Sequence, residues 1–79
     1  MKHVAIYTTP SCHFCQMAKA FFKEHNVQYE EYNVAEDQAR RTEMIQMTGQ
    51  LGVPVIAIDD MLMVGFSQAK VAEMLGITA

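Results

Sequence analysis

Two cysteines three residues apart, Cys12 and Cys15, stand where an apolar run gives way to a helical pattern, and this junction constrains the fold most strongly. Residues 3–8 are rich in β-branched and aromatic side chains and predict a buried strand. Residues 9–11, Thr-Pro-Ser, break that strand, because proline lacks an N–H and serine favours turns and helix caps. The apolar spacing over residues 13–25 predicts a helix. The cysteine pair therefore follows a strand and opens a helix.

The rest of the chain continues to alternate strand and helix patterns. Asn26 and Gly49 are suited to end the first two helices, and residues 59–60 to turn a hairpin. Glu36 and Asp37 suit the first turn of the second helix, where carboxylates meet the positive end of the helix dipole. We predict strands over residues 28–34, 53–58 and 61–64, and helices over 36–48 and 67–75.

This order, β-α-β-α-β-β-α, places the chain in the α/β class. The first β-α-β unit should form a parallel pair with a right-handed crossover, and the hairpin should add antiparallel strands. Such a mixed sheet needs helices on both faces. The chain has 79 residues, enough for one domain, so we expect residues 1–79 to form a single domain.

The composition limits the kinds of binding partner and the cellular compartment that we expect for this chain. The hydrophobic fraction of 51% and charged fraction of 19% are typical of a soluble globular domain. A net charge of −3 argues against nucleic acid or an anionic membrane, because both reward a basic face. No apolar run is long enough to cross a bilayer or to form a signal-peptide core. We expect a cytoplasmic monomer.

The low number of cysteines favours a chemical role for them over a role as structural disulfides. Small secreted proteins that rely on disulfides usually carry more than two cysteines. A bond between Cys12 and Cys15 would close a very short loop and remove little entropy from the unfolded chain. The pair therefore points to redox or metal chemistry in a reducing compartment.

The position of Cys12 favours a reactive thiolate. Backbone N–H groups at a helix start have no partner within the helix and carry partial positive charge. A protonated His13 would favour the thiolate further. Cys12 can then attack a disulfide, and Cys15, one helical turn later, can attack the resulting mixed disulfide and release the reduced substrate. We predict Cys12 and Cys15 as the catalytic residues.

Three other hypotheses for the cysteine pair remain open. The two thiols can be inert packing groups in a redox-inert interaction domain. A zinc site needs four ligands, and the chain offers two cysteines, three scattered histidines and no second Cys-x-x-Cys. A metal or iron–sulfur binder without reductase activity would need ligands from a second chain or from glutathione. The strand–turn–helix context favours the redox hypothesis.

Two later segments are candidates for binding substrate. Pro54 marks a strand start, a sheet edge or a cis peptide. A cis Pro54 facing the cysteines would let the backbone of Val53 pair with an extended substrate, whereas the alternative is a simple strand-initiating turn. Gly65, Phe66 and Ser67 open the last helix, whose N–H groups can hold a carboxylate. The alternative there is a plain turn with Ser67 as N-cap.

Several stretches together resemble the glutaredoxin-like branch of the thioredoxin superfamily over nearly the whole chain: Ile6-Tyr7-Thr8, Cys12-x-x-Cys15, Val53-Pro54 and Gly65-Phe66. The resemblance implies a minimal thioredoxin fold with a four-stranded sheet of order 2-1-3-4, three helices and a cis proline beside the cysteines. It implies that Cys12 is the nucleophile, that Cys15 is the resolving thiol, and that the Val53 backbone meets the substrate. No bound cofactor is implied.

The departures from glutaredoxins concern the reductant. His13-Phe14 stands where glutaredoxins carry Pro-Tyr, and Val64-Gly65-Phe66-Ser67-Gln68 lacks the acidic pair of their glutathione site. This version is similar to redoxins that supply electrons to ribonucleotide reductase and are recharged by thioredoxin reductase. Arg40 and Arg41 can offer charge to glutathione or form a solvated helix face. The resemblance implies a disulfide-containing protein as substrate, with thioredoxin reductase or glutathione as electron source.

The remaining features predict no chemistry. Glu30 and Glu31 indicate a solvent-facing strand. The methionines are expected to fill the core, because methionine packs adaptably, with a methionine-rich partner surface as the alternative. This expectation covers four residues: Met44, Met47, Met61 and Met63.

Overall fold

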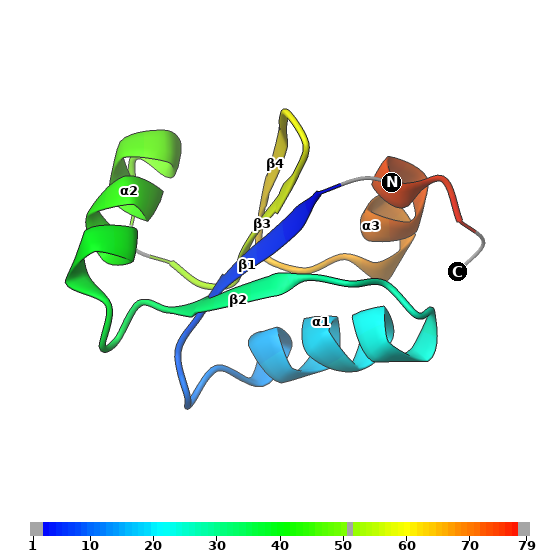
Figure 1. The fold of residues 1–79 in the computed structure, drawn as a ribbon, viewed down its shortest axis with the longest axis horizontal. Helices are drawn as coiled ribbons and strands as arrows, with labels where there is room; N and C mark the ends of the chain where they lie inside the picture. The colour runs from blue at the N-terminus through cyan, green and yellow to red at the C-terminus, as the bar shows by residue number, and fades with distance from the viewer. Residues whose placement is uncertain (1–2, 51, 78–79) are drawn as a thin grey trace.

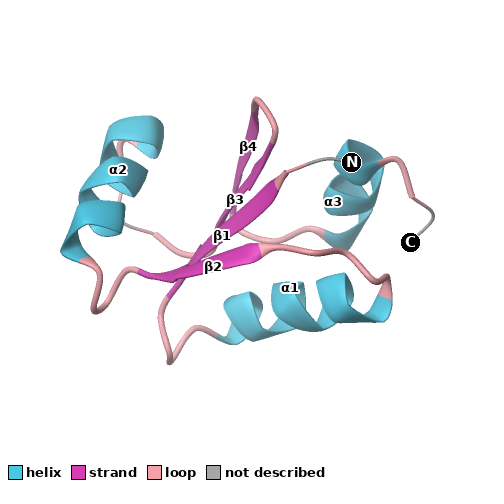
Figure 2. Ribbon diagram, in the orientation of Figure 1, coloured by secondary structure: helices cyan, strands magenta, loops and turns pink. Residues whose placement is uncertain are grey.

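The computed structural model describes residues 3–50 and 52–77 and shows the predicted order of strands and helices (Figures 1 and 2). The seven elements are β1 (Val4–Thr8), α1 (His13–Glu24), β2 (Glu30–Asn33), α2 (Gln38–Thr48), β3 (Val55–Ile58), β4 (Met61–Val64) and α3 (Gln68–Leu75).

The four strands form one sheet in the order β2-β1-β3-β4. β1 pairs with β2 in parallel, whereas β1 with β3 and β3 with β4 are antiparallel. α1 crosses over from β1 to β2, as a parallel pair requires. The topology confirms the minimal thioredoxin fold with order 2-1-3-4.

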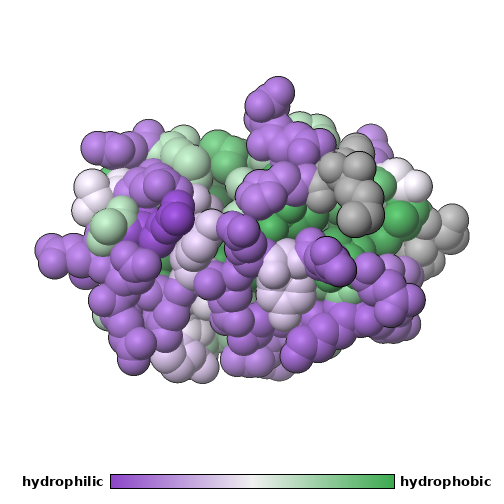
Figure 3. Space-filling view, viewed as in Figure 1, coloured by the Kyte–Doolittle hydropathy of each residue, from purple (hydrophilic) through white to green (hydrophobic). Residues whose placement is uncertain are grey.

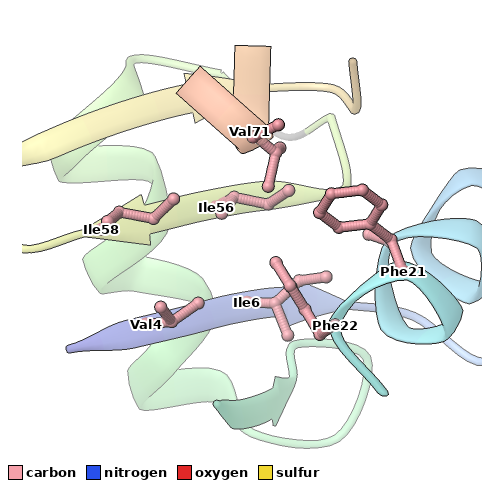
Figure 4. Close-up of a cluster of buried hydrophobic side chains, with 9 residues drawn as sticks. Val4, Ile6, Phe21, Phe22, Ile56, Ile58 and Val71 are labelled. Atoms are coloured by element: carbon pink, nitrogen blue, oxygen red, sulfur yellow. The ribbon is translucent and has the colours of Figure 1, made fainter. Parts of the chain in front are cut away.

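The larger core lies between the sheet and the helices α1 and α3. Alternate residues of a strand point to the same face, so Val4 and Ile6 of β1 join Ile56 and Ile58 of β3. Figure 4 shows these four side chains directed towards Phe21 and Phe22 of α1 and Val71 of α3. Ala18 and Ala72 complete the buried cluster. The helix that carries the cysteines is thus fixed by the main hydrophobic core.

The opposite face of the sheet, covered by α2, has a smaller core and a polar cluster. Tyr7, Val34, Met44 and Val55 are its buried residues. We call the four side chains of Tyr7, Tyr32, Arg40 and Glu43 the polar cluster.

Contacts within the polar cluster tie α2 to the sheet. The Tyr7 hydroxyl donates to Glu43 Oε1 at 2.5 Å. The Arg40 guanidinium lies 3.1 Å from the same carboxylate and 4.0 Å from the centre of the Tyr32 ring. Burial, with the Glu43 carboxylate beside it, raises the pKa of Tyr7 to about 12.

Some predicted boundaries differ from the structure. The second helix begins at Gln38 and not at residue 36, because Asp37 is its N-cap and accepts the Arg40 N–H at 3.1 Å. Glu36 lies in the preceding turn, where its N–H donates to the Asn33 carbonyl. β2 is shorter than the predicted strand over residues 28–34. Gly49 ends α2 in the left-handed region with φ 73°, as predicted.

The predicted starts of two further elements move later along the chain. The third strand starts at Val55 and not at residue 53, so Val53 and Pro54 precede it. The last helix starts at Gln68, with Ser67 as N-cap residue. In both places the residues predicted to bind substrate belong to the connection and not to the element itself.

The expectation that the methionines fill the core is wrong for two residues. Met44 is fully buried, and Met63 packs against the larger core. Met47 and Met61 are each 39% exposed, because α2 and the edge strand β4 leave these positions uncovered. In the face shown in Figure 3, hydrophilic side chains gather over α1, and hydrophobic ones reach the surface beside α3. None of the helices in the described ranges is long and apolar enough to span a membrane.

Candidate functional site

Cys12 occupies the N-cap position of α1, as the sequence predicts. Its backbone is extended, with φ −83° and ψ 112°, so the chain changes direction at this residue before the helix begins. The Cys12 N–H donates to the Thr9 carbonyl at 3.2 Å, which closes the turn between β1 and α1. The turn therefore presents the Cys12 sulfur at the helix start.

The two cysteines are joined by a capping hydrogen bond. The Cys15 N–H donates to Cys12 Sγ at 3.1 Å, so the sulfur takes the role that a serine or aspartate oxygen plays in most N-caps. A negative charge on this sulfur gains both the hydrogen bond and the positive end of the helix. Both residues are unbonded thiols in this structure.

The two thiols have different environments. Cys12 is half-buried, whereas Cys15 is fully buried. Burial raises the pKa of the Cys15 thiol to about 12, and the hydrogen bond with Cys12 acts in the same direction. The Thr9 backbone and the Lys19 ammonium act in the opposite direction. Of the two cysteines, Cys12 is thus the one that solvent reaches.

The strand register brings the predicted binding segments to the same end of the sheet as the cysteines. Val55 pairs with both Tyr7 of β1 and Val64 of β4, so Pro54 and Gly65 lie beyond that row, next to Thr8. The Gly65 N–H donates to the Pro54 carbonyl at 2.7 Å. The Val53-Pro54 peptide bond is cis, as the resemblance implies, and Pro54 directly precedes β3.

The residues after Gly65 are divided between core and surface. Phe66 packs against the larger core, with its ring centre 6.0 Å from that of Phe21. Ser67 is exposed at the N-cap of α3, but its side chain makes no capping hydrogen bond. Phe66 is therefore partly buried against the core, whereas Ser67 is exposed.

The two arginines of α2 differ in availability. Arg40 is engaged by Glu43 and by the Tyr32 ring. Arg41 is exposed and lines a cavity of about 280 Å³ together with Thr9 of the active-site turn. Of the two, Arg41 is the one whose charge is close to the turn that leads to Cys12.

A polar network near Cys15 is not predicted by the sequence pattern. Lys19 Nζ lies 2.9 Å from Glu31 Oε2, and the same oxygen accepts a hydrogen bond from the Thr8 hydroxyl at 2.9 Å. Thr8 is only 2% exposed. Glu31 is thus more than the solvent-facing strand residue that was expected. The spacing of four from Cys15 to Lys19 was the available signal, because it places both on one helix face.

The described part of the chain contains no group of three or more His, Cys, Asp or Glu side chains able to hold a metal ion. A metal at Cys12 would therefore need ligands from outside residues 3–50 and 52–77, which is what the metal-binding hypothesis already assumes.

Known proteins resemble the chain in sequence and in structure. The family model described as Glutaredoxin matches residues 4–63. Glutaredoxin 3 of Escherichia coli is 39% identical over 59 residues, which are 75% of this chain and 71% of that protein. The glutaredoxin-like protein NrdH of Lactococcus lactis is 31% identical over 71 residues, 90% and 97% of the two chains. A mutant of the thioredoxin-like protein BC3987 superposes with a TM-score of 0.91 at 33% identity, covering 99% of this chain and 100% of that one.

Proposed function

Because the chain belongs to the glutaredoxin family of thiol–disulfide oxidoreductases, we propose that it reduces disulfide bonds in proteins through a Cys12–Cys15 dithiol. One observation supports this assignment of roles above others. The half-buried Cys12 sulfur caps α1 and accepts the Cys15 N–H at 3.1 Å, whereas the Cys15 thiol is fully buried. The accessible sulfur is the nucleophile, and the buried one acts second.

The proposed reaction has two exchange steps. The Cys12 thiolate attacks one sulfur of the substrate disulfide, so a Cys12–substrate bond forms, the substrate disulfide breaks, and the other sulfur leaves as a thiolate. Cys15 then attacks Cys12 Sγ, which forms the Cys12–Cys15 disulfide and releases the second substrate thiol. Two electrons pass from the dithiol to the substrate, and no bound cofactor is needed.

Residues around the cysteines support a protein as the substrate. We propose that the Val53 backbone pairs with an extended substrate segment next to Pro54, and that Gly65, Phe66 and Ser67 contact it from the other side. Phe14, between the cysteines, is 54% exposed. An exposed aromatic ring beside the nucleophile suits the apolar centre of a protein–protein contact.

We propose thioredoxin reductase as the electron source. Ser67 and Gln68 follow Gly65 without an acidic pair, and Arg40 is already paired with Glu43. Arg41 beside Thr9 is the feature that favours glutathione instead. We further propose a monomer that works in the cytoplasm, where thiols are kept reduced, as an electron donor to a reductase such as ribonucleotide reductase.

A coupled assay tests the electron source directly. The protein is supplied with insulin disulfides as substrate and with NADPH plus either thioredoxin reductase or glutathione and glutathione reductase. We expect faster NADPH oxidation with thioredoxin reductase. Faster turnover with glutathione would contradict the choice of reductant but leave the dithiol chemistry in place.

Two cysteine variants test the dithiol itself. Cys12→Ser should abolish activity with either reductant, because no accessible thiolate remains. Cys15→Ser should accumulate a mixed disulfide between Cys12 and the substrate, visible by mass spectrometry and cleaved by dithiothreitol. Activity in Cys12→Ser would contradict the proposed function.

A further inference from the structure

The network of Lys19, Glu31 and Thr8 lies one helical turn beyond Cys15. Residues four apart on a helix share a face, so the Lys19 side chain leaves α1 on the same side as Cys15. That side chain is only 19% exposed, although lysines are mostly exposed in proteins. The network therefore holds the positive charge of Lys19 in a half-buried position, where the ammonium loses part of its hydration.

Cys15 needs such a charge if it is to act as a thiolate. Its sulfur is shielded from solvent, and the neighbouring Cys12 sulfur disfavours a second negative charge. The groups acting on Cys15 are Cys12, the Thr9 backbone and Lys19, and Lys19 is the cation among them. Tyr29 and Lys23 act in turn on the Lys19–Glu31 pair.

The other two members of the network fix the lysine. The Lys19 ammonium and the Thr8 hydroxyl meet at one oxygen, Glu31 Oε2, each at 2.9 Å. Lys19 lowers the pKa of Glu31, so this residue stays a carboxylate at neutral pH. A lysine held in this way is screened less by water than a free one.

We propose that Lys19 is a positioning residue for the second exchange step, in which its anchored ammonium favours the Cys15 thiolate that attacks the mixed disulfide. This inference rests on the proposed function. The Cys15 sulfur forms a bond to Cys12 Sγ, and the bond from Cys12 to the substrate sulfur breaks. The substrate sulfur leaves as a thiolate and takes up from water the proton that Cys15 released.

The two steps can be timed separately with 5,5′-dithiobis(2-nitrobenzoic acid). The first thionitrobenzoate is released when Cys12 attacks the reagent, at a rate that rises with reagent concentration. The second is released when Cys15 attacks Cys12, at a rate independent of that concentration. Stopped-flow absorbance on the reduced protein resolves both phases.

Lys19→Met should slow the second phase and leave the first nearly unchanged. A rise of one unit in the pKa of Cys15 would leave about tenfold less thiolate, partly offset by its greater nucleophilicity, so the net loss at neutral pH should be about threefold. The midpoint of the pH profile of the second phase should move upward. Lys19→Arg should restore it, because the positive charge returns.

Two further variants separate this effect from a general change. Lys70→Met removes the same charge from an exposed position on α3 and should leave the second phase unchanged. Glu31→Gln keeps an oxygen that Lys19 can contact but removes the negative charge, so more of the lysine's field should reach Cys15. Its pH midpoint should move downward, opposite to that of Lys19→Met.

The outcomes distinguish the two levels of the proposal. A normal first phase with a second phase unaffected by Lys19→Met would overturn the role of Lys19. Shifts of Lys19→Met and Glu31→Gln in the same direction would also overturn it, because they would indicate a structural effect. Absence of both phases in the unmodified protein would overturn the proposed function. If Lys19→Met does not fold, the pH midpoints of Glu31→Gln and Lys19→Arg still test the role of Lys19.

Discussion

The two faces of the sheet are stabilised by different forces. In the described part of the chain, the buried cluster on the face that carries α1 and α3 has nine apolar residues, and Phe22 is among the largest fully buried side chains. The buried cluster on the α2 face has four members among the described residues and adds the polar cluster, in which the Tyr7 hydroxyl donates to Glu43 at 2.5 Å. The cysteines belong to the helix on the apolar face. α1 is therefore held mainly by apolar contacts that do not depend on pH, to which the Lys19–Glu31 ion pair is added, whereas the polar cluster has a larger share in holding α2.

The largest expected effect is on the apolar face. Phe22→Ala removes a fully buried ring from the larger core and should lower the free energy of unfolding by about 3–5 kcal/mol, as truncation of a core phenylalanine usually does. Urea denaturation followed by circular dichroism measures the loss. A loss below 1 kcal/mol would show that this face is not the main source of stability.

Met44→Ala should cost less, about 2–3 kcal/mol, since the α2 core is small and Met44 borders a surface cavity into which neighbours can relax. The same denaturation experiment compares the two variants. The first thionitrobenzoate phase should survive in Met44→Ala, because α1 rests on the other face. Loss of that phase in the folded variant would show that the two faces are coupled at the site.

Tyr7→Phe tests the polar cluster with the ring retained. It removes the hydroxyl that donates to Glu43 and should lower the free energy of unfolding by about 1 kcal/mol, the usual net value of such a bond. Between pH 10 and 12, the free energy of unfolding of the variant should also fall less than that of the unmodified protein. Because the folded pKa of Tyr7 is raised from 10.0 to about 12, its stabilisation is complete below pH 10 and disappears as the pH rises through that range. An equal loss of stability between pH 10 and 12 in Tyr7→Phe and in the unmodified protein would contradict this assignment.

The smallest expected effect is at acid pH. The Tyr7 hydrogen bond and Arg40 lower the pKa of Glu43 below its ordinary value of 4.5, so its stabilisation is present above that value and is lost as the pH falls further. The carboxylate is 42% exposed, so solvent screens the effect. In Glu43→Gln the melting temperature should fall slightly less between pH 5 and pH 3 than it does in the unmodified protein. Glu24→Gln, on the exposed side of α1, is the control. A larger change in the control would refute the assignment.

The sequence predicts those features that depend on neighbours along the chain. The strand–turn–helix pattern places Cys12 at the N-cap, and the hydrophobic periods give the order of elements. Contacts between distant residues are not predicted. Glu31 meets Thr8 across a separation of 23 residues, and Gly65 meets Pro54 only because the register of β3 and β4 brings them together. Exposure of Met61 likewise depends on β4 lying at the edge of the sheet, which no local pattern reveals.

The cap of α1 has a consequence for the redox potential. A Cys12 thiolate is a strong acceptor for the Cys15 N–H, whereas a sulfur in a neutral disulfide is a weak one. Oxidation therefore leaves the first turn of the helix less well capped, and the reduced form is favoured by an amount comparable to a helix cap, about 1 kcal/mol. For a two-electron couple this corresponds to about 20 mV towards a more oxidising potential. The hydrogen bond to the sulfur that we propose as the nucleophile is thus expected to make the protein a slightly weaker reductant and one that is more readily reduced again.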